Sequence, residues 1–572
     1  MKKTLLAITY KELILALLSG LLLGLSWHKP FTFLIFIGFV PLFLLITQSE
    51  NLFGAITDKA LLKIEQRKLN YLFYLAFITW NLTVYWWLYY VGIVAFLFAV
   101  FANSLLMLLP VILYKYIKRK TENKFGLWVF IACWICFEYL HTQNWGFSWT
   151  WLNLGNAFGN TPSWVQWYEY TGVFGGSAWV LVINYLVFKN IPQYFITNNT
   201  NHIANSQNNT QITSQITKKW QKISLAIVLF VPFGISQFLF YNYKEEGKEV
   251  EILVLQPNFD TYTQKFQYNA RTGETNTTSY VPFDKQFERF LTLTRQQITN
   301  KTALVLLPET AWNDDIDETA VGVNGYISRM SQYRDSFPNL SILTGADSYT
   351  FYYNATEKPT PTARYHSPNT YYDVFNAAMF LNTKNEPLFY HKSMLVVGVE
   401  SNPLRSVIGF LQKTVMQNMG NLVGDLGIQS ERSVFVAAGN LKVAPIVCYE
   451  SIYGEYVTDY VKNGANILCV ITNDGWWDNS PAPRQHLSFA SLRAIETRRA
   501  VARSANTGIS AFITQKGEII QQSNYNETTT LKNNLKMNEN LTIYVRFGDI
   551  LARFAVFMVL FFLFKSINYQ RV

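Results

Sequence analysis

The sequence has few charged residues for its length. Asp, Glu, Lys and Arg make up 15% of its 572 residues, whereas a soluble globular domain carries about 25%. Aromatic residues reach 16%, with 43 Phe, 34 Tyr and 16 Trp. This balance excludes an ordinary, wholly soluble protein and is typical of a chain with a large part in a membrane.

Cysteine is scarce as well. The chain has four, of which Cys133 and Cys136 lie in one apolar run, Cys469 lies in another, and Cys448 ends a third. They form neither a disulfide framework nor a metal-type pair with histidine partners. The surroundings of the first two, "FIACWICFEYL", indicate packing in lipid, so these cysteines predict no metal site.

The chain contains several long apolar segments. A membrane helix needs about 20 predominantly apolar residues, and such segments dominate residues 1–245, whereas 248–540 lose this character. One more run, "ILARFAVFMVLFFLFK", follows near the end. Seven spans plus one are therefore predicted, at 12–28, 30–47, 71–89, 91–114, 126–142, 172–190, 223–242 and 550–565.

Lysine and arginine predict the orientation, because cytoplasmic loops carry an excess of both. They gather before the first span and after the second, fourth and sixth, whereas the alternate loops hold Lys29 alone. The N-terminus is therefore expected in the cytoplasm, with residues 248–545 outside and the last span returning inside. The net charge of +10 is then a topology signal and not a nucleic-acid surface, which would need those lysines on the globular part.

Three segments have competing interpretations. The first apolar run starts with positive charge like a signal peptide, but no A-x-A-like site closes it, so we expect it to be retained. Residues 195–216 are rich in Asn, Thr and Gln and predict a flexible cytoplasmic linker. Residues 143–170 are crowded with Trp, Tyr and Gly, which predicts an interfacial aromatic belt or, alternatively, part of a lipid-binding groove under the outer domain.

Short apolar runs that end in polar residues characterise residues 248–540. Such runs are typical of strands buried on both faces and covered by helices, and "SLRAIETRRAVARSA" at 491–505 has a helical pattern. This part is therefore predicted to be an α/β sandwich, whose sites form beyond the carboxyl ends of its strands. The predicted strands are 249–258, 303–309, 340–347, 441–450 and 465–474.

Cys448, in "APIVCYESIYG", ends one of these strands. The apolar residues that follow recur with helical spacing, which predicts a helix starting near the cysteine. The dipole of that helix would favour the thiolate, and its first N–H groups would face an oxyanion. A lone cysteine at a strand end is nevertheless more often a packing residue, so its neighbours decide its role.

Two charged residues lie in comparable places. Glu309, in "LLPETAW", ends an apolar strand, where burial would raise its pKa and suit it to general-base catalysis; alternatively, it caps the next element. The letters "LPET" are half of a sorting signal, but Ala311 stands where that signal needs glycine. Lys392, in "LFYHKSMLVVGVES", would lower a thiol pKa and stabilise an oxyanion, or else it is a surface lysine.

The order Glu, Lys, Cys on successive segments resembles the nitrilase, or carbon-nitrogen hydrolase, superfamily, which uses such a triad on an αββα fold. With the predicted spans and the stretches "PETAW", "YHKSMLVVGVE", "PIVCYESIYG" and "TNDGWWDNSPAPRQHL", nearly the whole chain resembles the apolipoprotein N-acyltransferase family. The resemblance implies an α/β, nitrilase-like αββα sandwich at 246–545. This sandwich sits on a polytopic α-helical membrane domain at 1–245, and the eighth helix and a short cytoplasmic tail follow at 546–572.

The resemblance also assigns roles to residues. Glu309 would be the base, Lys392 the oxyanion-stabilising cation and Cys448 the nucleophile. The supporting residues would be Tyr449, Glu400 and Glu450, and the candidate substrate contacts are Trp312, Asn473 and Trp476. The chain departs from the family where "SMLVVGVE" replaces the usual "PFGE" before the second glutamate, and where Leu307 replaces the usual Trp before "PET".

The implied activity is the last step of bacterial lipoprotein maturation. A fatty acyl chain would pass from a phospholipid, through a cysteine thioester, to the amine of a diacylated apolipoprotein. The resemblance implies a monomer in the bacterial inner membrane, in contact with membrane lipids, with its catalytic domain on the periplasmic side and without cofactor, metal or nucleic acid. The alternatives are a membrane-anchored amidase that uses water, or a non-catalytic transporter or scaffold with Glu138 and His141 as intramembrane polar candidates.

Overall fold

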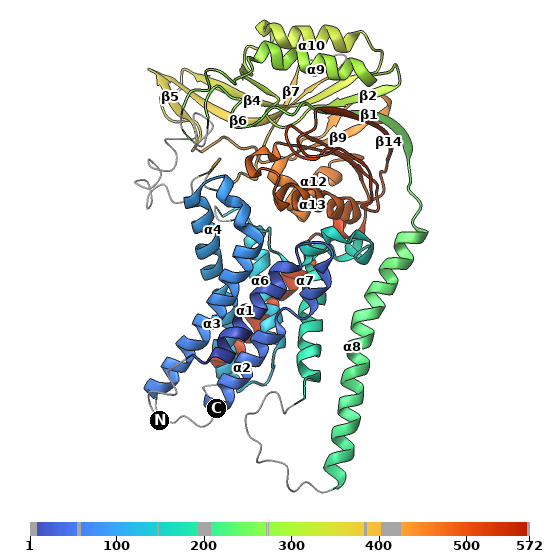
Figure 1. Ribbon diagram of the computed structural model, residues 1–572. Helices are drawn as coiled ribbons and strands as arrows, with labels where there is room; N and C mark the ends of the chain where they lie inside the picture. Colours follow the sequence, from blue (N-terminus) through green and yellow to red (C-terminus); the bar gives the residue numbers. More distant parts are fainter. Residues whose placement is uncertain are drawn as a thin grey trace.

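A helical part and an α/β part lie one above the other in this protein, for which a computed structural model describes residues 8–53, 59–145, 148–192, 208–269, 272, 274–382, 386–397, 399–401 and 425–568. Figure 1 shows the helices below and the strands above, with the long helix α8 (Asn208–Asn242) leading from one to the other. The chain returns to the helical part at its end, through α15 (Ile550–Asn568).

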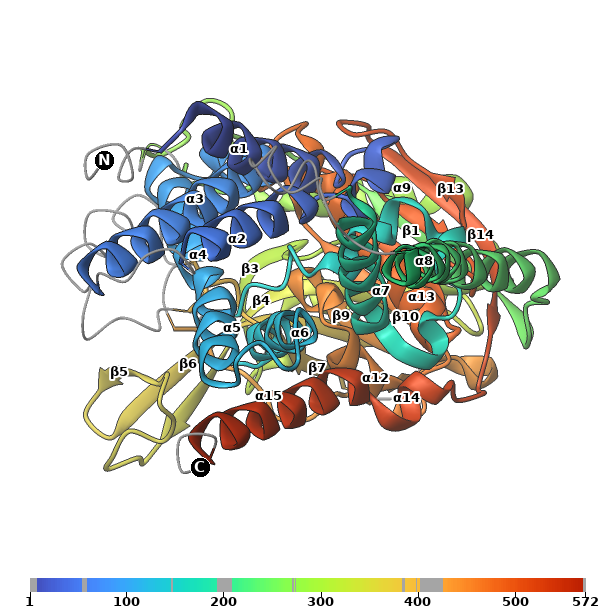
Figure 2. The same ribbon diagram turned by 90° about the horizontal axis from the view of Figure 1, so that it is seen from below.

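The eight predicted spans all fall on helical segments, with shifted ends. These are α1 (Tyr10–Leu25), η1 (Phe31–Phe36) with α2 (Val40–Phe53), α3 (Lys59–Tyr85) with η2 (Trp86–Tyr90), α4 (Ile93–Leu106) with α5 (Leu108–Lys120), α6 (Trp128–Thr142), α7 (Tyr168–Asn190), α8 and α15. Seen from below, α15 runs beside α5 and α6, so the last predicted span packs against these two helices (Figure 2).

Within the described residues, five helical stretches are long and apolar enough to cross a membrane. They are Phe31–Glu50, Ile93–Lys120, Tyr168–Asn190, Lys219–Asn242 and Ile550–Asn568. The apolar α6 has 15 residues and α1 has 16, short of the roughly 20 that a span needs. Helix length therefore establishes several candidate spans but does not confirm the predicted number of eight.

Aromatic side chains fill the centre of the bundle. Trp134 of α6 lies 4.8 Å from Phe39 and 6.2 Å from Trp80 of α3, measured between ring centroids, and Phe130 lies 5.8 Å away. All four are buried. Large flat rings in edge-to-face and stacked contacts join helices that share no hydrophobic driving force in lipid, which accounts for part of the aromatic excess.

The two polar residues that suited a transporter have local roles instead. Glu138 Oε1 accepts hydrogen bonds from Trp134 Nε1 at 3.0 Å and from the Leu154 amide at 2.8 Å, which ties η3 (Leu154–Asn160) to α6. His141 Nδ1 lies 3.3 Å from the Trp149 carbonyl oxygen. Both residues therefore hold the segment that follows their own helix.

The α/β part contains two sheets in its described residues, packed face to face. The first has the order β14-β1-β2-β4-β6-β5, with β3 paired to β4 and β7 to β6, and the second has the order β13-β12-β11-β10-β9-β8. The strands are β1 (Lys248–Gln256), β2 (Thr302–Leu306), β3 (Trp312–Asp317), β4 (Ser341–Tyr353), β5 (Arg364–Ser367), β6 (Thr370–Leu381), β7 (Leu388–His391), β8 (Phe435–Val436), β9 (Lys442–Val447), β10 (Ile467–Thr472), β11 (Ala500–Ala505), β12 (Ala511–Ile513), β13 (Ile519–Gln522) and β14 (Thr529–Met537).

Helices cover the outer face of each sheet. Figure 1 shows α9 (Phe283–Gln297) and α10 (Gly325–Asp335) above the first sheet, and α12 (Gly454–Lys462) and α13 (Pro481–Thr497) between the second sheet and the membrane helices. In β1, Leu253 packs in the layer under α9, whereas the adjacent Ile252 packs in the core shared with the second sheet. Successive side chains point to opposite faces, so a strand between two buried layers is apolar throughout, and the predicted αββα sandwich is the observed one.

All five predicted strands are present, but the helix predicted at 491–505 is wrong in its second half. α13 ends at Thr497, Arg498 adopts the left-handed conformation with φ 50°, and β11 follows between β10 and β12. Alanine and arginine favour a helix by local propensity. Both faces of β11 are buried, and pairing with two strands overrides that preference.

The structure partly describes two segments of unusual composition. Most of the predicted linker at 195–216 lies outside the described residues, and from residue 208 it belongs to α8. In the aromatic segment at 143–170, Trp151, Leu154 and Phe158 are buried, whereas Trp145 and Tyr170 near its ends are exposed. The segment packs between the bundle and α13, and the side chain of Trp151 donates a hydrogen bond to α13 at 3.0 Å.

Candidate active site

The three residues of the predicted triad follow the carboxyl ends of three strands. Glu309 comes shortly after β2, Lys392 directly after β7 and Cys448 directly after β9. All three are buried, with exposed fractions of 4%, 1% and 5%. Lys392 Nζ lies 3.1 Å from Glu309 Oε1, and the Cys448 thiol is near enough to the same carboxylate for each group to shift the pKa of the other. The two sheets thus bring together a sulfur, a carboxylate and an ammonium that are far apart in the sequence.

The Glu309 carboxylate is held from several sides. Its Oε1 accepts from Asn376 Nδ2 at 2.9 Å, and its Oε2 accepts from the Asn473 amide at 3.0 Å. Beneath it, β4 approaches so closely that a Cβ on Gly345 would lie 2.5 Å from the Glu309 Cα. Only glycine allows this approach, which places the base against the sheet. The next residue, Thr310, has φ 48°.

Glu309 has a pKa below its usual range. Burial by itself raises the pKa, but the Lys392 ammonium, the hydrogen bond from Asn376 and the nearby Cys448 thiol outweigh it. The prediction of a raised pKa is therefore wrong, because it considered burial without the neighbouring cation. The consequence is a carboxylate that is ionised at neutral pH and free of its proton before reaction.

Cys448 stands in a strained backbone conformation with φ 51°. Its carbonyl oxygen accepts from Ser451 Oγ at 2.8 Å and from His486 Nε2 at 3.1 Å, and these bonds hold the turn. The predicted helix near the cysteine is present in two pieces: the 3-10 helix η9 (Cys448–Ile452) starts at the cysteine itself, and the α-helix α12 begins at Gly454.

The thiol of Cys448 keeps its proton. Burial, and after it the Glu309 carboxylate, raise the pKa of this thiol well above its ordinary value, and Lys392 offsets the rise only in part. The predicted thiolate is therefore not the resting state. A thiol with a raised pKa beside an ionised carboxylate is an acid and base arranged for proton transfer on attack.

Lys392 has a second carboxylate partner. Its Nζ donates to Glu400 Oε1 at 2.8 Å, and Asn376 Nδ2 donates to the same oxygen at 2.9 Å. Burial alone lowers the pKa of Lys392, but Glu309 and Glu400 outweigh it, and the net pKa lies well above the ordinary value. Lys392 is therefore a permanent cation between two anions, and Asn376 spans both.

Glu450 joins the two loops that carry the ammonium and the thiol. Its Oε1 accepts from the Ser393 amide at 2.8 Å, from the Tyr390 hydroxyl at 2.7 Å and from the Tyr456 hydroxyl at 2.6 Å. Its Oε2 accepts from the Val447 amide at 2.9 Å. One fully buried carboxylate thus fixes the turn after β7 against the turn after β9.

The remaining predicted residues are placed as follows. Trp312 lies in the core beside Phe283 of α9, 5.7 Å between ring centroids, and is fully buried, so the structure does not bring it to the site. Trp476 in η10 (Asp474–Trp477) is half-buried and stacks on Phe266 at 6.2 Å. Tyr449 faces the membrane part, where its hydroxyl donates to the Ser148 carbonyl at 3.3 Å.

Two residues at the site escaped sequence reasoning. Asn376 is a polar residue in the apolar second half of β6, "VFNAAMFL", and this signal was available. Lys265, in "TYTQKFQ", carries no such signal, because a lysine in a polar loop reads as exposed. It is in fact buried, and its Nζ donates to the Glu309 carbonyl oxygen at 3.0 Å.

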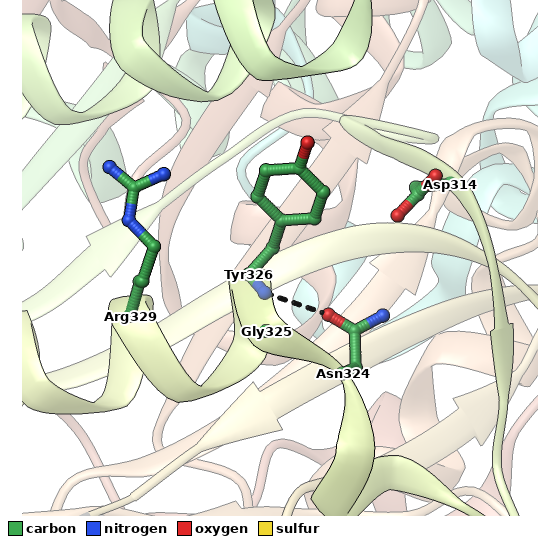
Figure 3. A pocket seen from close by; sticks show the side chains of 5 residues that line it. All are labelled: Asp314, Asn324, Gly325, Tyr326 and Arg329. Carbon is green, nitrogen blue, oxygen red and sulfur yellow. Dashed lines mark hydrogen bonds between the residues drawn. The ribbon is translucent and has the colours of Figure 1, made fainter.

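A separate hollow of about 460 Å³ lies at the start of α10 (Figure 3), the helix that Figure 1 shows on the side away from the membrane helices. It is lined by Asp314, Asn324, Gly325, Tyr326 and Arg329. The oxygen of Asn324 already caps α10, accepting from the Tyr326 amide at 3.1 Å, and Arg329 pairs with Glu288. Asn324 and Arg329 are thus engaged within the protein, and the hollow is not part of the site described above.

A buried thiol, carboxylate and ammonium at the strand ends of an αββα sandwich define a nitrilase-type cysteine enzyme. The carbon-nitrogen hydrolase family model matches residues 203–539, more than half of the chain, and the N-terminal domain model of apolipoprotein N-acyltransferases matches residues 19–186. The chain belongs to the apolipoprotein N-acyltransferase family of that superfamily.

Relatives match the chain over its full length. The apolipoprotein N-acyltransferase of Chlorobaculum tepidum is 26% identical, over 94% of this chain and 93% of that protein. The one from Geobacter metallireducens is 25% identical, over 99% and 98%. Among solved structures, the chain is similar to Saccharomyces cerevisiae Nit3, a nitrilase-superfamily member, with 11% identity and a TM-score of 0.34, covering 50% of this chain and 90% of that one.

Proposed function

We propose that this enzyme transfers a fatty acyl chain from a membrane phospholipid to the N-terminal amine of a diacylated apolipoprotein, through a thioester on Cys448. The observation that carries the proposal is the convergence of Cys448, Glu309 and Lys392 directly above a bundle of membrane helices. A diacyl lipid is costly to extract into water, at about 0.8 kcal/mol per CH₂. A site joined to the bundle avoids that cost.

In the first half-reaction, Cys448 Sγ attacks the ester carbonyl carbon of the phospholipid while Glu309 takes the thiol proton. The carbonyl oxygen becomes an oxyanion, which Lys392 and the Tyr449 amide stabilise. The C–O ester bond then breaks, Glu309 returns the proton to the leaving oxygen, and a lysophospholipid departs. The product is an acyl thioester on the enzyme, with Glu309 ionised as before.

In the second half-reaction, the amine nitrogen of the diacylglyceryl-cysteine attacks the thioester carbon. Glu309 accepts a proton from the nitrogen as the N–C bond forms, and the same cation and amide hold the second oxyanion. The S–C bond breaks, and the sulfur recovers its proton from Glu309. The N-acylated lipoprotein leaves, and neither half-reaction needs a redox step or a cofactor.

The proposed placement follows from the charge pattern. Lysine and arginine in the loops support eight spans, with the domain at 246–545 on the periplasmic side of the bacterial inner membrane. The helical part at 1–245 and the last segment at 546–572 then form the membrane anchor of a monomer. Trp476 and Phe266, stacked beside the site, are the proposed apolar contacts of the acyl donor.

Mass spectrometry of the protein purified from membranes tests the function. We expect the mass of a fatty acyl group on Cys448, its release on addition of a diacylated peptide, and its absence from Cys448→Ala. Cys469→Ala is the matched control, because Cys469 is fully buried in β10. If Cys448→Ala still N-acylates the peptide, the proposal fails. If only free fatty acid appears, the enzyme is an amidase-like hydrolase that uses water.

A further inference from the structure

A second pair of charged side chains lies behind the proposed base. Lys265 is in the loop after β1, and Asp347 is in β4 next to Ala346. The exposed fractions of the two residues are 1% and 6%. The reaction as derived above uses neither of them, although burial of charge is costly unless the charge has a partner.

Lys265 is fixed at both ends. Its carbonyl oxygen accepts from Gln286 Nε2 of α9 at 2.9 Å and from Asn313 Nδ2 of β3 at 2.7 Å. Its ammonium donates to the carbonyl oxygen of Glu309 at 3.0 Å. The Glu309 carbonyl belongs to the main chain of the proposed base, one residue before Thr310, which has a left-handed conformation. The Lys265 ammonium therefore stabilises the turn that positions the Glu309 carboxylate.

The charges of the site balance only when Lys265 is counted. Glu309 and Glu400 are two anions, and Lys392 is one cation. Lys265 adds the second cation. The charged groups that face Lys265 are Asp347 and Glu309. Those that face Asp347 are Lys265, Asp315, Glu309 and Glu400.

We propose that Lys265 is a positioning residue for acyl transfer, which holds the main chain of the proposed base Glu309 and adds a buried positive charge beside it. The inference rests on the proposed function and assigns a role to a residue beside the same site. It requires Lys265 to be charged and Asp347 to be neutral while the enzyme works.

The protonation of the pair meets this requirement at neutral pH. Burial lowers the pKa of Lys265 to about 8, although Asp347 and Glu309 act to raise it. Burial raises the pKa of Asp347 to about 8, against the effect of Lys265. Both groups lose their protons as the pH rises through this range, so the site gains two units of negative charge beside a developing oxyanion. Acylation should therefore slow above about pH 8.

The triad itself does not titrate in this range. The pKa of Glu309 lies below its usual value and that of Lys392 well above. A fall in the rate of thioester formation near pH 8 therefore reports on Lys265 and Asp347, and the two residues are separable by mutation. Lys265→Met removes the cation at similar length, and Asp347→Asn removes the anion at similar volume.

The experiment measures the rate of acyl-enzyme formation on Cys448 from phosphatidylethanolamine in detergent micelles, between pH 6 and pH 9.5. Lys265→Met should lower the rate at pH 7 by about tenfold or more, the equivalent of one lost charge-assisted hydrogen bond. The pH at which the rate of the Lys265→Met variant falls should be higher than in the unaltered protein, because Asp347 loses the cation that lowers the Asp347 pKa. Asp347→Asn should move the fall to lower pH, because Lys265 loses the anion that raises its pKa.

Opposite shifts of the two profiles distinguish this role from simple support of the fold. Lys285→Met, an exposed lysine of α9, is the control and should keep the native profile. If Lys265→Met does not fold, the direction of the Asp347→Asn shift decides alone. A native rate in Lys265→Met at pH 7, or an Asp347→Asn profile that stays in place or moves upward, would overturn the inference. Absence of any acyl-enzyme in the unaltered protein would instead refute the proposed function.

Discussion

At the scale of single residues, the proposed reaction starts from a cysteine thiol that still carries its proton. The Cys448 thiol has a raised pKa and the Glu309 carboxylate a lowered one, so the resting pair is a neutral thiol and an ionised base. Proton transfer is unfavourable until the sulfur begins to bond to carbon. In the proposed reaction, the carboxylate must therefore accept the thiol proton at each acylation.

Replacement of the base tests this view. Glu309→Gln keeps the shape but cannot accept the thiol proton, and loss of a general base costs about 10²–10⁴-fold in rate. We expect thioester formation on Cys448 to fall by that factor, followed by mass spectrometry at short reaction times.

The matched control is Glu288→Gln on α9, where a half-exposed carboxylate pairs with Arg329. A surface ion pair contributes about 0–1 kcal/mol, so this variant should acylate at the native rate. Native acylation in Glu309→Gln would contradict the assignment of the base.

At the scale of elements, the sequence predicted strands better than it predicted what joins them. The predicted strands are apolar runs that end in polar or reactive residues, and this pattern located Glu309 and Cys448. The contacts across the sequence were out of reach: the pattern marks Asn376 as polar within an apolar strand but not its partners, and nothing local marks Lys265. β11 was mistaken for a helix because its burial, and not its composition, decides its state.

Glu450 connects the loop after β7 to the loop after β9. Its hydrogen bonds include one from the Ser393 amide in the turn after β7 and one from the Val447 amide at the end of β9. In Glu450→Gln, one accepting oxygen becomes an NH₂ donor, and a buried amide is left without an acceptor at a cost of about 1–3 kcal/mol. Thermal unfolding should shift to lower temperature and thioester formation should slow at least tenfold.

Tyr456→Phe is the control for this change. It removes a single hydroxyl that donates to the same carboxylate at 2.6 Å and leaves both main-chain contacts. Its rate of thioester formation should stay within a few-fold of the native rate. Equal losses in the two variants would show that Glu450 does not act by joining the loops.

At the scale of the whole molecule, the membrane part and the catalytic part are joined under α13. Arg498, 3% exposed, donates from Nε to Glu169 Oε2 at 2.8 Å and from Nη1 to Gln166 Oε1 at 2.8 Å. Trp151 and Tyr449 add contacts from either side of the same joint. Tyr449, the residue beside the proposed nucleophile, therefore contacts the segment that follows α6 directly.

Loosening this joint should affect lipid substrates more than soluble ones. Arg498→Met removes the guanidinium and leaves Glu169 and Gln166 without their partner, at a cost of about 2–4 kcal/mol. We expect a large loss of thioester formation with phospholipid in vesicles, and a smaller loss with a short-chain phospholipid present as monomers. The ratio of the two rates is the measurement, because a general loss of folded protein lowers both equally.

Arg329→Met provides the comparison for this ratio, since Arg329 is half-exposed on α10, away from the membrane helices. Its ratio should equal that of the unaltered protein. An unchanged ratio in Arg498→Met would mean that the joint holds the two parts together without setting access to the bilayer. A fall confined to vesicles would mean that the distance between lipid and sulfur is fixed by a buried arginine at the end of α13.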